Sequence, residues 1–188
     1  MWKSKVYHLK STCPMIMHNG QLADPLNKFS KALKQITSKR SKTEADHEEI
    51  AHIEFLGSLY MGENGPIIPS FMIEACLIGG AKKFKEGNVA KAGMYIGEHS
   101  RLIYDGPKAP EELYLDEQYR DKRAVVVQNS RIIRTRPIFP IWEADTEVFY
   151  EDTVVNGSRI DEWIITSGNI VGFGDMRPRY GRFEVKIG

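Results

Sequence analysis

The sequence has few of the features that restrict function at once. It holds only two cysteines, Cys13 and Cys76, in 188 residues, and its 26 basic residues are balanced by 25 acidic ones. Two cysteines cannot build a disulfide framework, so we expect both to be small, buried, apolar residues without a redox or metal role. A net charge of +1 gives no global signal for nucleic acid. Any such signal must come from local clusters of charge.

Long apolar runs are missing as well. No stretch approaches the roughly 20 apolar residues that a membrane span needs, and the N-terminal MWKSKVYHLK has no apolar signal-peptide core. The hydrophobic content of 41% is ordinary for a folded chain. We therefore expect a single soluble domain over residues 1–188, in a reducing cytoplasm and without a membrane partner.

The usual patterns for metals and cofactors are also absent from the sequence. His47 and His52 are five residues apart, which places them about 140° from one another around a helix, whereas a zinc helix needs histidines four apart. The glycines near the C-terminus form no Rossmann fingerprint, because Arg177 stands where the third glycine belongs. They form no P-loop either, because no Gly-Lys-Ser/Thr follows them. We expect no metal and no cofactor, and a catalytic role is the less favoured expectation.

The order of the predicted elements gives a fold class. Period-two alternation predicts strands, and i, i+3, i+4 spacing together with capping residues predicts helices. Strands are predicted over 5–19, 101–104, 123–139 (one long strand or a bent pair), 143–152 and 181–187, and helices begin near Thr43, Pro69 and Ser158. Without insertions at 20–65 and 85–122, the order is β-α-β-β-α-β. The sequence thus predicts an α+β, ferredoxin-like (RRM-like) domain with one open sheet face, where modules of this architecture hold single-stranded RNA.

A segment rich in glycine and arginine, SGNIVGFGDMRPRYGRFEV, precedes the last predicted strand. Its glycines permit positive φ and the close approach of a ligand, and its guanidinium groups suit phosphate oxygens. The alternative is a basic surface turn whose arginines stack on Phe173 or Tyr180. A second arginine cluster lies on the strand over 123–139, which we expect in the same sheet, so that both clusters could form one surface.

Two further basic patches are candidates for binding nucleic acid. The segment 28–42 carries six basic residues and no acid, but the acid-rich helix expected over 44–54 is an alternative partner for it. A lysine pair follows the helix that begins near Pro69. The residues predicted to contact nucleic acid are Arg177, Arg179, Arg182, Arg134, Arg136, Arg131, Lys39, Arg40, Lys82, Lys83, Phe173, Tyr180, Gly172, Gly174, His18 and Asn19.

Three segments of the chain resemble the RAMP superfamily, the RNA-binding backbone subunits of CRISPR effector complexes. VYHLKSTCPMIMHN is similar to the opening strand and its Pro-apolar-apolar-(His/Gly) turn. GPIIPSFMIEACLIGGAKK resembles the strand-to-helix segment, although Ser70 replaces a glycine and Glu74 and Ala75 replace lysine and glycine. GNIVGFGDMRPRYGRFEV resembles the glycine-rich loop before the last strand. The chain also resembles stand-alone phage and prophage proteins.

The resemblance implies an RRM-like palm that holds RNA through backbone contacts. It implies thumb-like or finger-like insertions at 20–65 and 85–122, protomers that stack along the strand, and other CRISPR-effector-like subunits as further partners. The expected location is the cytoplasm of a bacterial host, with a phage gene as one source. Some members cleave a bound target with an aspartate after the first strand, and Asp24 is the nearest candidate here, with His18 as a candidate base.

The leading hypothesis is a non-catalytic protein that binds single-stranded nucleic acid, RNA rather than DNA, and self-assembles along the strand. The first alternative is a phage or prophage assembly protein that uses the fold for protein contacts. The second alternative is an RNA-processing nuclease.

Overall fold

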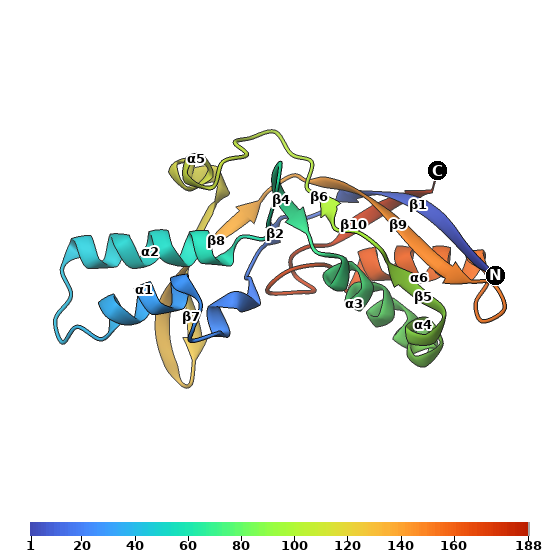
Figure 1. Cartoon of the computed structure of the whole chain (residues 1–188), viewed down its shortest axis with the longest axis horizontal. Helices are drawn as coiled ribbons and strands as arrows, with labels where there is room; N and C mark the ends of the chain where they lie inside the picture. Colours follow the sequence, from blue (N-terminus) through green and yellow to red (C-terminus); the bar gives the residue numbers. More distant parts are fainter. Residues whose placement is uncertain (188) are drawn as a thin grey trace. The chain divides into compact units, whose positions relative to one another are not determined.

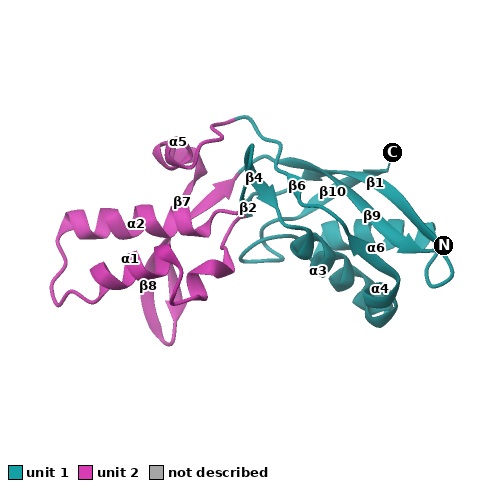
Figure 2. Ribbon diagram, in the orientation of Figure 1, with its two compact units in different colours: residues 1–15, 61–105, 140–188 teal, residues 16–60, 106–139 magenta. Residues whose placement is uncertain are grey.

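The computed structural model describes residues 1–187, which divide into two compact units (Figure 2). Unit 1 comprises residues 1–15, 61–105 and 140–188, and unit 2 comprises residues 16–60 and 106–139. The described chain forms six α-helices and three antiparallel sheets, which confirms the mixed α+β class. None of the helices within residues 1–187 has the length and apolarity that crossing a membrane requires.

Unit 1 contains a four-stranded antiparallel sheet and two long helices (Figure 1). Its elements follow one another as β1 (Trp2–Ser11), α3 (Ser70–Ala81), β5 (Met94–Ile96), β9 (Glu143–Glu151), α6 (Gly157–Ile170) and β10 (Phe183–Ile187). The strand order is β10-β1-β9-β5, so that β1 and β9 are central. The edge strand β5 was not expected. The strand expected over 101–104 is instead β6 (Ser100–Arg101), which pairs with β4 (Gly65–Ile68).

The two helices cover one face of this sheet. Tyr7 and Leu9 of β1 are fully buried on this face. Val6, which precedes Tyr7 and lies on the opposite face, is 56% exposed. The Tyr7 hydroxyl donates to Asp161 of α6 at 2.7 Å, and burial together with this bond raises the pKa of Tyr7 above its ordinary value. Lys5 of β1 donates to the same carboxylate at 2.7 Å. Alternation along β1 therefore leaves the opposite face of the sheet open to solvent.

Close packing between α3 and α6 explains the glycine pair near the end of α3. A Cβ on Gly80 would lie 2.2 Å from the Ser167 hydroxyl oxygen and 2.5 Å from the Trp163 carbonyl oxygen, both on α6. No side chain fits in that space, so the helices approach with backbone against backbone.

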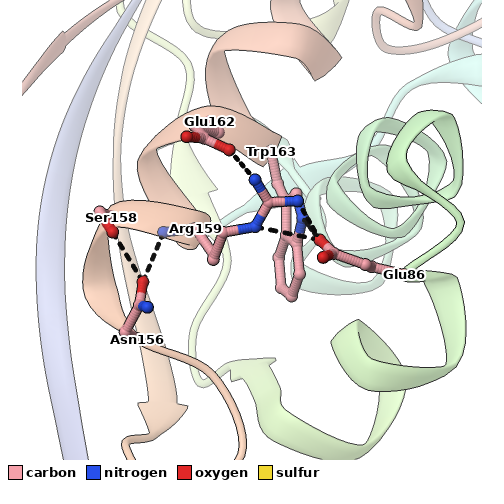
Figure 3. A network of polar contacts seen from close by, with 6 residues as sticks. All are labelled: Glu86, Asn156, Ser158, Arg159, Glu162 and Trp163. Atoms are coloured by element: carbon pink, nitrogen blue, oxygen red, sulfur yellow. Dashed lines mark hydrogen bonds and ion pairs between the residues drawn. The ribbon is translucent and has the colours of Figure 1, made fainter.

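The ends of α6 differ from the predicted ones. Asn156, not Ser158, is the N-cap, and its side chain accepts from the Arg159 amide at 3.0 Å (Figure 3). Ser158 donates to Asn156 at 2.7 Å instead. The helix continues to Ile170 and includes Gly168. A Cβ at Gly168 would lie 2.2 Å from the Phe183 carbonyl oxygen. That glycine allows β10 to approach α6.

A polar network fastens the first turns of α6 to the chain that follows α3 (Figure 3). The Arg159 guanidinium donates to Glu86 at 3.1 Å, and the Trp163 indole N–H donates to the same carboxylate oxygen at 2.8 Å. Arg159 holds the pKa of Glu86 below its ordinary value. The remaining elements of unit 1 are β3 (Met61–Gly62), the 3₁₀ turn η2 (Lys82–Phe84) and α4 (Gly87–Gly93).

Unit 2 contains a second sheet, in the order β2-β8-β7, with helices packed on it. Its elements are η1 (Gly20–Ala23), α1 (Lys28–Thr37), α2 (Glu44–Ser58), α5 (Pro110–Leu115), η3 (Glu117–Tyr119), β7 (Arg120–Val127) and β8 (Ser130–Phe139), and it begins within β2 (Met15–Ile16), at Ile16. The predicted start of α2 is confirmed, because Thr43 and Asp46 form a complete capping box.

The expectation that the strand region 123–139 shares a sheet with the glycine-rich segment is wrong. This region is a hairpin of β7 and β8 in unit 2, which is the bent pair rather than the single strand. The chain turns at Gln128 and Asn129, which have φ of 47° and 65°. Two consecutive residues at positive φ are the geometry of a tight hairpin turn, and asparagine adopts it readily. The strands therefore pair with each other and not with β1 or β9.

Candidate nucleic-acid interface

The loop between α6 and β10, residues 171–182, has a fixed backbone shape and is called the arginine loop below. The Gly172 amide donates to the Ser167 carbonyl at 2.9 Å, and the Phe173 amide donates to the Gly181 carbonyl at 2.9 Å. The Gly181 amide donates to Pro14 at 2.8 Å, which ties the loop to the segment after β1. These bonds make the loop a structured part of unit 1.

Three glycines give the arginine loop its path. Gly172, Gly174 and Gly181 have φ of 74°, 72° and 74°, a region that other residues enter only with strain. A Cβ on Gly181 would lie 1.9 Å from the Phe173 carbonyl oxygen. The expected positive φ is confirmed. The atoms that approach Gly181 belong to the loop itself, and the close approach of a ligand stays a prediction.

Phe173 anchors the loop in the core, so the prediction that it stacks on bases is wrong. Its side chain is fully buried and lies parallel to Phe183, with ring centroids 4.6 Å apart. Trp142 packs against both rings, at 5.8 Å from Phe173. A ring enclosed by two aromatic neighbours cannot reach a ligand in the folded protein. Tyr180 is half-buried, and base stacking by Tyr180 stays a prediction.

The arginine side chains of the loop are exposed to solvent. Arg177, Arg179 and Arg182 are exposed, and none of the three takes part in an ion pair within residues 1–187. The acid of the loop, Asp175, accepts from the Met176 amide at 2.8 Å. Guanidinium groups without carboxylate partners remain available for phosphate oxygens.

The two cysteines lie beneath and beside this loop. Cys76 is fully buried, which confirms the expected burial, and burial raises the pKa of its thiol to about 12. Cys13 is half-buried, and its sulfur accepts from the Arg182 amide at 3.2 Å. Cys13 therefore helps to hold the arginine loop in place.

The second arginine cluster serves the fold of unit 2. Arg134 forms an ion pair with Glu54, which is 5% exposed and also accepts from the Thr135 amide at 3.1 Å. Arg136 is 5% exposed and lies 3.5 Å from Asp121. Burial and the Asp121 partner argue against a phosphate contact by Arg136. The side chain of Arg134 is 35% exposed and is held by Glu54, and a phosphate contact by Arg134 stays a prediction. Arg131 is exposed near the hairpin turn.

Arg136→Met is expected to lower the free energy of unfolding by about 2 kcal/mol, because within residues 1–187 Asp121 then keeps an ion pair with Arg123 alone. Arg131→Met on the same strand is the matched control, and its effect is expected to stay within about 0.5 kcal/mol. Urea unfolding of both variants measures the difference. Equal effects would show that Arg136 has no structural role.

The other predicted basic residues divide in the same way. All four are exposed, but Lys39 lies 2.5 Å from the buried Asp46, whereas Arg40, Lys82 and Lys83 have no ion pair within residues 1–187. Asn19 caps η1, and its amide group donates to the Leu59 carbonyl at 2.9 Å, so its side chain is used within unit 2. His18 is exposed. The acid-rich helix α2 thus neutralises the basic segment at Lys39 but not along its whole length.

The pair of Lys39 and Asp46 predicts a pH dependence. The Lys39 ammonium and the Thr43 amide hold the pKa of Asp46 at about 2, below its ordinary 3.8. A carboxyl whose pKa is lowered by folding stabilises the protein above its unfolded pKa, and this contribution disappears as the pH falls towards the folded value. We expect the urea midpoint of wild type to fall more steeply between about pH 4.5 and pH 2 than that of Asp46→Asn. Parallel profiles would contradict the assignment.

The two candidate catalytic residues, Asp24 and His18, are both exposed in unit 2. Asp24 is exposed, and its carboxylate accepts from the Leu26 amide at 2.8 Å. Across residues 1–187, no group of three or more His, Cys, Asp or Glu side chains could hold a metal ion. His52 lies 2.6 Å from Glu111, which belongs to α5.

The open face of the sheet in unit 1 is acidic along β9, one of the two central strands. Glu143, Asp145 and Glu147 of β9 lie on this face, since the residues that alternate with them, Ala144, Thr146 and Val148, are buried on the other face. Three aromatic rings lie near the C-terminal end of β9. Tyr95 stacks on Phe149 with ring centroids 5.0 Å apart, and it meets Trp2 edge-on with ring centroids 5.1 Å apart. Sequence reasoning missed this surface, although strict alternation in EADTEVFYE places the acids on one face.

In comparisons with known proteins, no family model matches this chain, and no curated protein matches it significantly.

Proposed function

We infer that this chain is a non-catalytic protein that binds single-stranded nucleic acid, RNA rather than DNA, and that unit 1 is its ferredoxin-like, RRM-like palm. The order β-α-β-β-α-β, with the first and third strands central, supports that assignment of the fold. The resemblance to RAMP subunits supports RNA, a bacterial or phage source, and protomers that associate along the strand.

The observation that carries the proposal is the arginine loop. Its backbone is fixed by hydrogen bonds to Ser167 and Pro14, and three exposed guanidinium groups without ion pairs project from it. A preformed loop loses little conformational freedom when it binds. Guanidinium groups bind phosphate oxygens in pairs of hydrogen bonds, which favours contact with a nucleic-acid backbone over contact with the bases.

The open sheet face is a poor site for the strand in this protein. Three carboxylates, those of Glu143, Asp145 and Glu147, lie on this face. His8 of β1 lies 3.3 Å from Glu143 and 2.8 Å from Asp145, whereas Glu147 has no ion pair within residues 1–187. Carboxylates repel phosphates, so the binding mode that RNA-recognition modules use is disfavoured. We therefore assign the nucleic acid to the arginine loop, with Lys82 and Lys83 as additional exposed cations of unit 1.

Nucleic acid that co-purifies with the protein tests this proposal. We expect protein isolated at low salt to carry RNA, which ribonuclease removes and deoxyribonuclease does not. Clean protein that also fails to bind labelled single-stranded RNA and DNA at low salt would overturn it. RNA with a narrow length distribution would indicate a defined number of protomers on each strand.

The second candidate function is an assembly protein that uses the fold for protein contacts. The open sheet face favours it, because exposed aromatic rings and carboxylates together suit a protein partner better than a phosphate chain. This candidate predicts oligomers in protein freed of nucleic acid.

A further inference from the structure

The open face of unit 1 contains a groove at the end where the aromatic rings lie. Its volume is about 450 Å³, and among its lining residues are Tyr95, Phe149 and the carboxylates of Glu98, Asp145 and Glu147. No lysine or arginine lines it. Glu98 and Glu147 are exposed and have no ion pair within residues 1–187. We call this feature the acidic groove. It suits a cationic group, because aromatic faces and carboxylates both attract cations.

Unit 2 supplies a surface with the opposite charge. Lys28, Lys31 and Lys34 recur at three-residue spacing along α1, and all three are exposed. Ile36 of the same helix is buried, so α1 packs through its apolar side and leaves its lysines in solvent. Lys31 and Lys34 have no ion pair within the part of the chain that the structure describes.

The spacing of the lysines along α1 is close to the spacing of the carboxylates along β9 in the acidic groove. Side chains three residues apart on a helix lie about 5–6 Å from one another. Alternate side chains along a strand lie about 6.6–6.8 Å from one another, which is the separation expected for Asp145 and Glu147. The long lysine stems adjust to this small difference, and their methylene groups can lie on Tyr95 and Phe149.

We propose that the acidic groove of one protomer binds the lysine face of α1 of a second copy. The inference deepens the self-association that belongs to the proposed function, and it names the surface. Because the two patches lie at different places on the chain, the contact is heterologous, and each copy can bind one neighbour at its groove and another at its helix. The association needs no nucleic acid and is weakened by salt.

Charge reversal on either side tests the contact in protein treated with nuclease. The groove variant is Glu98→Lys with Glu147→Lys, and the helix variant is Lys31→Glu with Lys34→Glu. Sedimentation velocity at low salt is expected to show oligomers for wild type and an association constant at least about 100-fold lower for each variant alone. An equimolar mixture of the two variants is expected to associate again, because each interface then joins unlike charges.

Two controls make the test specific. Glu63→Lys with Glu112→Lys changes the net charge like the groove variant but alters exposed acids elsewhere, and this variant is expected to associate like wild type. Arg177→Glu with Arg179→Glu is also expected to associate normally. Wild type that stays monomeric at low salt, or a mixture of variants that does not associate, would overturn the inference. Association that requires RNA would overturn it too and would leave the binding function of the arginine loop intact.

Discussion

Arg177→Glu with Arg179→Glu is expected to weaken the binding of single-stranded RNA by at least about 100-fold at low salt. Both guanidinium groups are exposed and lack ion pairs within residues 1–187, so the substitutions break no ion pair there and folding should be unchanged. Loss of two phosphate contacts should also make the slope of log affinity against log salt less steep by about 1.4. Fluorescence anisotropy of a labelled RNA measures both quantities.

The matched control for this variant is Lys91→Glu with Arg101→Glu. Both residues are exposed in unit 1, and the control makes the same change of net charge away from the arginine loop. We expect the control to bind RNA within a few-fold of wild type at moderate salt, where long-range charge effects are screened. Equal losses in the two double variants would mean that overall charge, and not the loop, determines binding.

Gly181→Ala is expected to lower the free energy of unfolding by about 3 kcal/mol. At φ of 74°, an alanine is strained, and its Cβ would lie 1.9 Å from the Phe173 carbonyl oxygen. That oxygen belongs to backbone that Phe173 holds in the core, so it cannot simply move aside. The loop should therefore lose its shape, and RNA affinity should fall even where the protein remains folded.

Gly20→Ala provides the control for this substitution. A Cβ at Gly20 has no heavy atom within 4 Å, so we expect its effect on stability to stay within about 0.5 kcal/mol. Thermal or urea unfolding compares the two variants directly. A Gly181→Ala protein as stable as Gly20→Ala would show that the backbone path of the arginine loop is not fixed as described.

Local signals in the sequence predicted local structure well. The helix start predicted near Thr43 is confirmed by a capping box with Asp46, and the glycines of the arginine loop adopt the predicted positive φ. Both predictions depend on residues within a few positions of one another. The alternation that predicted β1 and β9 is equally local, and it follows from burial of one face.

Contacts between distant residues could not be predicted in this way. Arg134 pairs with Glu54, which lies 80 residues earlier in the chain, and no periodicity links the two. The sequence alone does not reveal that pairing, so it does not distinguish an arginine that pairs with a buried acid from one that binds phosphate. Phe173 shows the same limit, because only the fold brings Phe183 and Trp142 against its ring.

The sheet assignment failed for a related reason. The strand pattern over 123–139 is correct, but Gln128 and Asn129 turn the chain back on itself. The pair then forms a sheet in unit 2, and the two arginine clusters lie in different units. The proposed binding at the arginine loop therefore does not depend on Arg134 or Arg136.

The salt dependence of RNA binding by wild-type protein freed of nucleic acid is the most direct measurement. With three loop arginines on phosphates, we expect clear binding at about 50 mM salt and a log–log slope of about −2 or steeper. No binding at about 50 mM salt, or a slope near zero, would contradict a phosphate-binding arginine loop.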